Sequence, residues 1–363
     1  MALPSERIEL QRETEESEAR ELESVPEDRV KYGFPDMSAC MSQWASELGL
    51  EEELASVERR MRELINSSQK ILTDVALHVV DSGGKRLRPS LAILAHRSLM
   101  GEDIDSVIDI SAAIELIHSA TLIHDDINDG AEMRRGKRAA YRQFGLHEAI
   151  VAGDFMFAMA FCVGGKYEAD IVDLVAESCR SLAEGEIMQY MNRNNSDLSV
   201  EEYMKIIRGK TAHPIKTSAQ VGARLAERNG DQIKAFGGYG MNIGIAFQIV
   251  DDILDIVGDE KSLGKRTGSD IREGNMTLPV ILAAENDPDV ARRLPGVLGN
   301  RDIGARQTAE FLAMIRESGG VDAAYDASHR YAEAGLEYLD GIQDSIFKNK
   351  LAELPKLIIG RSI

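Results

Sequence analysis

Cysteine is scarce in this chain, and its scarcity narrows the class of protein. Only Cys40, Cys162 and Cys179 occur among 363 residues, and none has the Cys-x-x-Cys or Cys/His spacing of a metal site. A disulfide framework and a structural zinc site are therefore disfavoured, and a reducing compartment fits the composition. We expect a cytoplasmic protein.

Positive charge and long apolar runs are also in short supply. The 42 Lys and Arg residues are outnumbered by 61 Asp and Glu residues, which gives a formal net charge of −19. Nucleic-acid binding needs a basic surface that displaces counterions from phosphates, so this acidity argues against it. We expect no apolar stretch of about 18 residues, and hence at most transient membrane contact. The acidic N-terminus does not resemble a secretory signal.

Strand patterns are missing too, and helical patterns take their place. From about Leu50 onward apolar residues recur at intervals of three and four, without alternation of Val and Thr. Segments 151–163 and 241–257 are apolar on nearly every side, which is typical of helices at the centre of a large bundle. We predict one all-α domain over residues 51–363, and an acidic, mobile extension over residues 1–50.

An acidic cluster ends the apolar helix that we predict over residues 104–123. It reads His-Asp-Asp-Ile-Asn-Asp at 124–129, and a helix would place Asp125 and Asp129 one turn apart on the same face. Carboxylates at a helix C-terminus repel one another and oppose the helix dipole, so a divalent cation is expected to offset them. Alone, the cluster is also compatible with a solvated helix end or, through His124-Asp125, with a metal-dependent phosphohydrolase.

The same spacing recurs far downstream, in Asp-Asp-Ile-Leu-Asp at 251–255, again after an apolar helix. If the two helices pack side by side, their carboxylates face each other across a cavity. Such a cavity would hold about two to three Mg²⁺ ions and a diphosphate, because hard cations prefer oxygen ligands. Two matched clusters are hard to explain as independent solvated surfaces.

Two basic motifs supply the charge that an anionic substrate requires. Gly-Gly-Lys-Arg-Leu-Arg-Pro at 83–89 places three bases behind a glycine pair, and Arg-Arg-Gly-Lys-Arg at 134–138 follows the first acidic cluster. Arg forks match phosphate oxygens, and Lys acts as a point charge. In a chain of net negative charge, bases close to acids favour a binding site over a general basic surface.

In their order along the chain, these motifs resemble the trans-polyprenyl diphosphate synthase family of farnesyl, geranylgeranyl and longer-chain synthases. The resemblance runs from about Leu64 to the C-terminus. Besides segments 83–89, 124–129 and 134–136, it rests on Lys210-Thr211, on Phe-Gln-Ile-Val-Asp-Asp-Ile-Leu-Asp at 247–255 and on Gly-Ser-Asp-Ile-Arg-Glu-Gly-Asn at 268–275. It implies a helical bundle of the isoprenoid synthase type with a central active-site cavity. It also implies an Mg²⁺-dependent homodimeric enzyme that joins isopentenyl diphosphate to an allylic prenyl diphosphate.

The resemblance also implies a role for each matched residue. Five carboxylates would hold the metal: Asp125, Asp126, Asp129, Asp251 and Asp255. Four residues would bind isopentenyl diphosphate: Lys85, Arg88, His118 and Arg135. Three would bind the allylic diphosphate: Arg134, Lys210 and Lys265. The carbonyl or hydroxyl dipoles of three residues would stabilise the allylic cation: Lys210, Thr211 and Gln248.

Two positions bear on substrate binding and product length. Asn275 stands where many relatives have Lys, so a cation is missing near the allylic diphosphate, and Arg266 or Arg272 would have to replace it. In the family, a bulky residue five positions before the first Asp stops elongation early. Here that position and the next are small, which favours geranylgeranyl diphosphate (C20) or a longer product. The chain-length candidates are Ala120 and Thr121, with Ile117, Phe155 or Phe157 as a tunnel floor.

Two rival functions fit parts of the pattern. A terpene cyclase shares the all-α architecture, but it usually pairs one Asp cluster with an Asn/Ser/Glu triad and does not need the 83–89 motif. A non-catalytic subunit of a heteromeric synthase loses its Asp clusters, whereas this chain keeps both.

Overall fold

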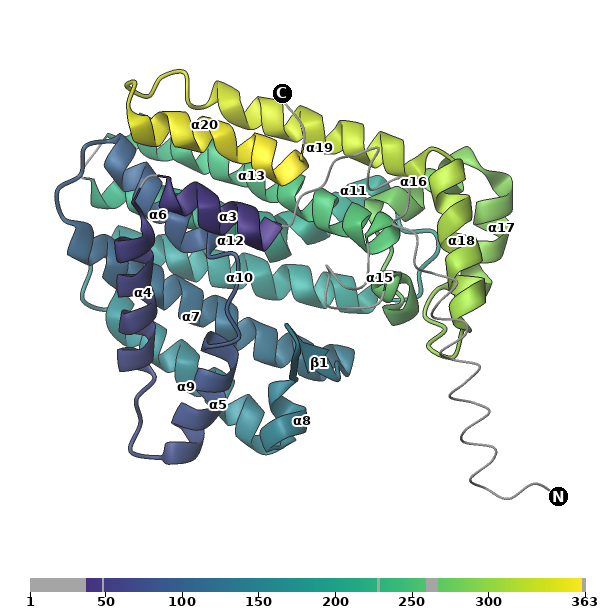
Figure 1. Cartoon of the computed structure of the whole chain (residues 1–363), viewed down its shortest axis with the longest axis horizontal. Helices are drawn as coiled ribbons and strands as arrows, with labels where there is room; N and C mark the ends of the chain where they lie inside the picture. Colours follow the sequence, from purple (N-terminus) through teal and green to yellow (C-terminus); the bar gives the residue numbers. More distant parts are fainter. Residues whose placement is uncertain (1–36, 48, 227–228, 259–266, 361–363) are drawn as a thin grey trace.

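The computed structural model describes four stretches of the chain, residues 37–47, 49–226, 229–258 and 267–360. Nearly all of their regular structure is helical, and the helices pack into one body (Figure 1). Within these stretches the strands are limited to β1 (Met133–Arg134) and β2 (Lys137–Arg138), which pair as an antiparallel hairpin. The prediction of an all-α fold is confirmed.

The helices follow one another with short connections. Those of the first half are α3 (Met37–Ser46), α4 (Glu51–Leu64), α5 (Lys70–Val80), α6 (Leu87–Ser98), α7 (Ile104–Asp129), α8 (Ala140–Phe144) and α9 (Leu146–Gly164). Those of the second half are α10 (Ala169–Met191), α11 (Val200–Ile207), the π-helix η1 (Arg208–Ala212), α12 (His213–Leu225), α13 (Gly230–Val257), α15 (Ser269–Glu273), α16 (Leu278–Asn286), α17 (Pro288–Val297), α18 (Ala305–Glu317), α19 (Gly320–Glu337) and α20 (Ile346–Ile359).

Two long helices, α7 and α13, form the centre of the body. Helix α7 packs mainly against α6 and α9, and α13 packs mainly against α12 and α19. Leu116 and Ile123 on α7, and Ile249 and Ile253 on α13, are fully buried. Burying these side chains stabilises the folded state by about 25 cal/mol for each Å² of apolar surface removed from water. Because neighbouring helices cover α7 and α13 on several sides, their sequences are apolar nearly all round.

Both central helices end where their acidic clusters lie. Gly130 adopts a left-handed conformation (φ 70°) and stops α7 directly after Asp129. Helix α13 stops at Gly258, shortly after Asp255. Each cluster therefore occupies the last turns of a helix whose upstream part is anchored in the core.

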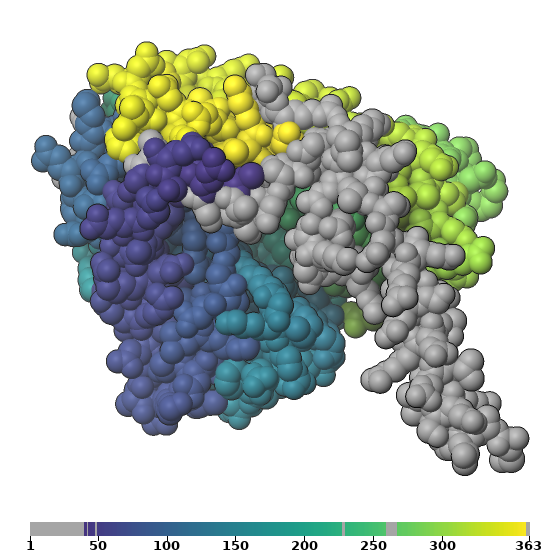
Figure 2. All heavy atoms as spheres, viewed as in Figure 1, coloured from purple at the N-terminus to yellow at the C-terminus, as the bar shows by residue number. Residues whose placement is uncertain are grey.

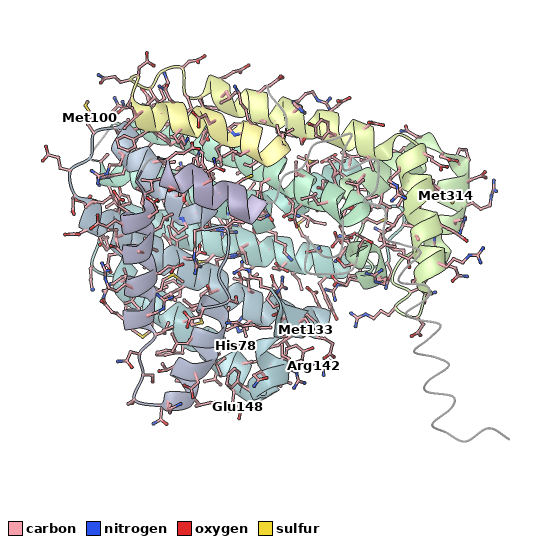
Figure 3. All side chains as sticks on the ribbon, viewed as in Figure 1. His78, Met100, Met133, Arg142, Glu148 and Met314 are labelled. Atoms are coloured by element: carbon pink, nitrogen blue, oxygen red, sulfur yellow. The ribbon has the colours of Figure 1, made fainter. Side chains whose placement is uncertain are left out.

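The β1–β2 hairpin, which carries Arg134 and Arg135, is held against α5. His78 on α5 hydrogen-bonds through Nε2 to the Arg138 carbonyl at 2.8 Å. The His78 ring also meets Phe144 of α8 edge-on, with centroids 5.3 Å apart. Figure 3 labels His78 close to Met133 at this corner of the molecule. The contacts place the basic hairpin beside the loop that follows α5.

Helix α3 lies inside the segment that we predicted as an extension. Met41 and Trp44 are buried, and the indole of Trp44 donates a hydrogen bond to the Lys350 carbonyl of α20 at 3.2 Å. Figures 1 and 2 show α3 (purple) lying along α20 (yellow). Residues 1–36 of the predicted extension lie outside the described residues, so its mobility remains a prediction.

Two described helices, α7 and α9, are long and apolar enough to span a membrane, so the expectation of no such stretch was wrong. An apolar window within α7 has a mean hydropathy of 1.5 although Asp109 and Glu115 interrupt it. In the apolar window of α7, 72% of the residues are buried, which identifies a core helix. In α9 only 33% are buried, so this helix presents apolar side chains at the surface of the chain.

Candidate active site

One cavity of about 820 Å³ brings the two acidic clusters and the two basic motifs together. Its walls come from the loop before α6, the β1–β2 hairpin and the helices α7, α10, η1 and α13. Most of the predicted site residues line it: Lys85, Arg88, His118, Thr121, Asp125, Asp129, Arg134, Arg135, Lys210, Thr211, Gln248 and Asp251.

Other predicted residues lie away from the cavity wall. Asp126, Asp255, Ala120 and Ile117 are buried in the surrounding structure, and Phe155 packs partly buried against the core. Lys265 and Arg266 lie outside the described residues. Asn275 lines the cavity, as a neutral group, and its side-chain amide donates to Glu273 at 3.4 Å.

In the first acidic cluster, each carboxylate meets a base. Asp126 is only 3% exposed and accepts a hydrogen bond from Nε of Arg134 at 2.8 Å. Asp129 pairs with Arg193, which follows α10. Oδ2 of Asp125 lies 3.9 Å from Nζ of Lys210. Arg134 thus turns Asp126 away from the cavity, whereas Asp125 and Asp129 face it.

The second cluster is held differently. Asp252 is 4% exposed and accepts hydrogen bonds from the Tyr203 hydroxyl and from Nε2 of Gln248. The carboxylate of Asp255 accepts from the backbone amides of Ser269 and Asp270 at 3.2 and 3.0 Å, at the start of α15. Only Asp251 of this cluster remains partly exposed, with Oδ1 3.9 Å from Nζ of Lys85.

Burial changes the pKa of the site's acids. It raises the pKa of Asp125 to about 7, where the neighbouring Glu186 and Asp129 also raise it and Lys210 opposes them. Burial likewise raises the pKa of Asp252 to about 7. A cation bound nearby would favour the charged form of both carboxyls and lower both pKa values.

Burial also controls the protonation of the bases. It lowers the pKa of His118 well below its usual value, and the adjacent Arg88 and Arg135 lower it further. The His118 imidazole is therefore neutral at pH 7 and can donate a hydrogen bond without adding charge.

The basic wall is built from the 83–89 loop and the hairpin. Nε of Arg88 is buried and has no hydrogen-bond partner among the described residues. The Arg135 guanidinium lies against Gly84, where a Cβ would come within 2.8 Å of Nη1, and it donates to the Gly83 carbonyl. The glycine pair thus allows a guanidinium to rest on the backbone of the loop.

The π-helix η1 places Lys210 and Thr211 on the cavity. Glycines let the backbone of η1 approach the backbone of α10 closely, since a Cβ on Gly185 would lie 2.6 Å from the backbone nitrogen of Lys210. Nζ of Lys210 reaches Glu186 and Gln189 of α10 at 2.8 and 2.9 Å. Oγ1 of Thr211 donates to Oε1 of Gln248 at 2.7 Å. A π-turn at a functional site is a common use of this geometry.

The donor set fits a hard divalent cation. Carboxylates from two helix ends face one cavity, and each is partly neutralised by a base that a bound cation could replace. In the part of the chain that the structure describes, no group of three or more His, Cys, Asp or Glu is already gathered around one point.

Three further cavity residues were missed by the sequence analysis: Glu115, Glu186 and Tyr203. Glu115 lies three residues before His118 on the same helix, so helical spacing could have placed it on the same face. Glu186 and Tyr203 belong to helices without a recognised motif, and no local signal linked them to the site.

A family model described as polyprenyl synthetase matches residues 69–315. Among curated relatives, the geranylgeranyl diphosphate synthase of Saccharolobus solfataricus is 36% identical, over 83% of this chain and 92% of that protein. The octaprenyl diphosphate synthase of Escherichia coli is 31% identical, over 85% of this chain and 96% of that protein.

Solved structures agree in fold. The Caulobacter crescentus polyprenyl synthase, crystallised with calcium and isoprenyl diphosphate, superposes with a TM-score of 0.84 at 33% identity, covering 88% of this chain and 98% of that one. The geranylgeranyl pyrophosphate synthetase of Pyrococcus horikoshii gives a TM-score of 0.81 at 33% identity, covering 88% and 99%. The helical fold expected from the resemblance is confirmed, and the chain belongs to the polyprenyl synthetase family of prenyltransferases.

Proposed function

We propose that this prenyl diphosphate synthase condenses isopentenyl diphosphate with an allylic prenyl diphosphate and makes a linear product of C20 or longer. The main support is the meeting of two acidic helix ends and two basic motifs on one cavity. A terpene cyclase would have no use for the basic loop at 83–89. A non-catalytic subunit would have no use for both acidic clusters.

The two diphosphates would occupy different walls. Lys85, Arg88, His118 and Arg135 all line the cavity, and the Arg135 guanidinium rests on the glycine pair beside Lys85, so these four would bind isopentenyl diphosphate. Arg134 and Lys210, which contact the first acidic cluster, would hold the allylic diphosphate. The separation allows each substrate to be bound by its own cations.

The cations are assigned to three of the carboxylates that line the cavity, Asp125, Asp129 and Asp251. A bound Mg²⁺ would supply positive charge that stabilises the departing allylic diphosphate. The hydroxyl of Thr211 and the amide of Gln248, joined by a hydrogen bond, would place their dipoles against the allylic carbon. The proton lost in the condensation would go to the departing diphosphate.

Small residues below the first cluster support a long product. Thr121, which lines the cavity, and Ala120, which is fully buried beside it in the sequence, are both small. The cavity continues between apolar side chains of several helices: Leu122, Leu182, Ile207, Ile215 and Phe247.

Incubation with labelled isopentenyl diphosphate, Mg²⁺ and each allylic primer from C5 to C20 would test the proposal. The products would be dephosphorylated and sized by chromatography. We expect prenols of C20 or longer from wild type, a shorter product from Ala120→Phe, and a longer one from Phe155→Ala if Phe155 is the floor. A C15 end point in wild type would contradict the chain-length proposal, and a cyclic hydrocarbon would indicate a cyclase.

We also propose that two copies pair through α9. Leu146, Ile150 and Phe161 share one side of this helix by their spacing and are 52%, 40% and 52% exposed. A large apolar helix face on a monomer marks an interaction surface. Light scattering should give twice the chain mass for wild type and a monomer for Phe161→Glu. A monomeric wild type would contradict this pairing.

A further inference from the structure

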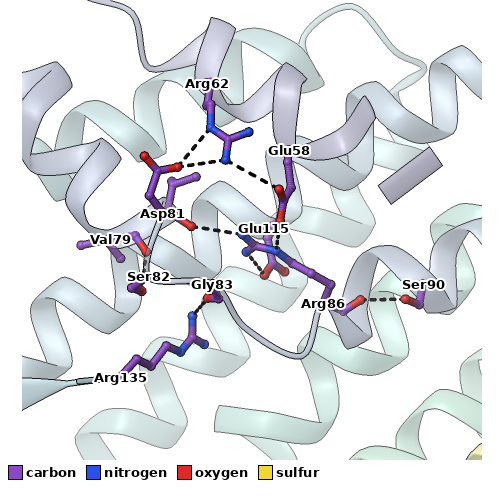
Figure 4. A network of polar contacts seen from close by, with 11 residues as sticks. Glu58, Arg62, Val79, Asp81, Ser82, Gly83, Arg86, Ser90, Glu115 and Arg135 are labelled. Carbon is purple, nitrogen blue, oxygen red and sulfur yellow. Dashed lines mark hydrogen bonds and ion pairs between the residues drawn. The ribbon is translucent and has the colours of Figure 1, made fainter. Parts of the chain in front are cut away.

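The turn that carries Lys85 is held by one neighbouring side chain, that of Arg86 (Figure 4). Its Nε donates to Glu58 of α4 at 3.1 Å, and its Nη1 donates to Glu115 of α7 at 3.0 Å. Its Nη2 donates to the Val80 carbonyl at the end of α5, at 3.1 Å. One guanidinium therefore joins three helices around the loop.

The backbone of Arg86 also needs such support. Its φ is 47°, in the left-handed region that residues with a side chain seldom adopt. This conformation turns the chain directly into α6, where the Arg86 carbonyl accepts a hydrogen bond from Oγ of Ser90 at 2.9 Å. A left-handed residue persists only where the surrounding contacts hold it.

The three contacts leave Arg86 little freedom to act as a ligand. The side chain of Arg86 is 9% exposed and that of Glu115 is 4% exposed, so their ion pair is shielded from water. Arg135 meets the same turn from the hairpin side, through the Gly83 carbonyl. The position of the turn thus sets where both Lys85 and Arg135 present their charges.

We propose that Arg86 is a positioning residue: held by Glu58 and Glu115, it fixes the 83–86 turn so that Lys85 and Arg135 meet the diphosphate of isopentenyl diphosphate. This inference rests on the proposed function, which assigns that diphosphate to Lys85, Arg88, His118 and Arg135. Shape matters here as well as charge, because Lys has one nitrogen and cannot reach three acceptors in three directions.

The test compares Arg86→Lys with Arg62→Gln. Arg62 belongs to the same network, with Nη2 3.0 Å from Asp81 and 3.7 Å from Glu58, but it is 46% exposed and lies outside the cavity lining. For Arg86→Lys we expect the KM for isopentenyl diphosphate to rise about tenfold, as for other supporting contacts of a binding site, while the KM for the allylic primer stays within twofold. Arg62→Gln should keep both KM values close to wild type.

Two further measurements separate positioning from other roles. Hydrogen exchange of the 81–88 segment should be faster in Arg86→Lys than in wild type or Arg62→Gln. Glu58→Gln, which lies outside the cavity lining, should raise the KM for isopentenyl diphosphate. If Arg86 contacted the diphosphate directly, freeing its side chain from Glu58 would leave that KM unchanged or lower it. The inference is overturned if Arg86→Lys matches wild type, if both KM values rise alike, or if Glu58→Gln leaves the KM for isopentenyl diphosphate unchanged or lowers it. A wild type that incorporates no isopentenyl diphosphate would instead refute the proposed function.

Discussion

The two acidic helix ends share one Asp spacing, but their carboxylates are buried and paired differently. At the end of α7, Asp125 and Asp129 face the cavity, and Asp126 is turned aside by Arg134. At the end of α13, Asp251 alone is partly exposed to the cavity, and Asp252 is buried against Tyr203. Each helix end thus contributes two carboxylates to the cavity lining, but on α13 one of the two, Asp252, is buried against other side chains.

The difference comes from the segment that the chain forms after each helix. A hairpin after α7 returns a guanidinium to the middle carboxylate of its cluster. At the end of α13, the last carboxylate of the cluster accepts hydrogen bonds from the first backbone amides of α15. Two motifs of the same Asp spacing therefore differ in which carboxylates are buried, because different neighbouring groups hydrogen-bond to their oxygen atoms.

Removing a cavity-facing carboxylate should have the largest effect. Asp125→Ala and Asp251→Ala should each lower kcat/KM by roughly 10³-fold, since several kcal/mol of charge stabilisation would be lost. Calorimetry with Mg²⁺ and inorganic pyrophosphate should show weaker metal binding in both. An Asp251→Ala enzyme close to wild type would remove the second helix end from the metal site.

Loss of the buried support for Asp252 should have the next largest effect. Tyr203→Phe removes the hydroxyl that donates to Asp252, and we expect kcat to fall by about 10- to 100-fold, as for other supporting contacts of metal sites. Tyr239→Phe is the matched control, because the Tyr239 hydroxyl is equally buried but donates to the Leu351 carbonyl. The control should cost about 1 kcal/mol of unfolding free energy without loss of activity.

The pH dependence of Mg²⁺ binding should test whether Asp125 of the first cluster is a metal ligand. The pKa of Asp125 is about 7 in the free protein, so below pH 7 the carboxyl is protonated and must lose its proton to bind Mg²⁺. We expect the affinity for Mg²⁺ to fall by about tenfold per pH unit below 7. Glu186→Gln removes a charge that raises this pKa, so the pH curve should move to lower pH. An unchanged curve in Glu186→Gln would contradict the assignment to Asp125.

The smallest effect on catalysis is expected at the last carboxylate of the second cluster. Asp255→Ala removes the acceptor for the first amides of α15, and we expect the free energy of unfolding to fall by about 1 to 2 kcal/mol. The kcat should stay within about twofold of wild type. Asp103→Ala, which removes the N-cap of α7, calibrates the cost of a lost cap in urea unfolding. A large loss of kcat in Asp255→Ala would make Asp255 a metal ligand after all.

Sequence periodicity predicted the helical fold and the charged motifs predicted the cavity, whereas the family resemblance supplied wall residues such as His118 and Thr211. The apolar segments, their helical period and the four charged motifs carry that information locally, as with Asp125 and Lys85. The separation of Asp126 from Asp125 could not be predicted, because it depends on Arg134 returning through a hairpin. The roles of Arg86 and Tyr203 were equally hidden, since each acts through a partner that is distant in the sequence.

The π-helix η1 has a consequence for the evolution of this cavity. A π-turn contains one residue more than an α-turn, so α11 and α12 are joined through a single inserted position. Deleting one residue from 208–212 would close this wide turn into a regular α-helix. The remaining residues of the turn would then point in new directions around the helix axis, because each residue of an α-helix advances by about 100°. The reactive polar groups at Lys210 and Thr211 would then lose their place without any change in their identity. In this enzyme, a change in chain length of one residue would be more damaging than most substitutions at the same site.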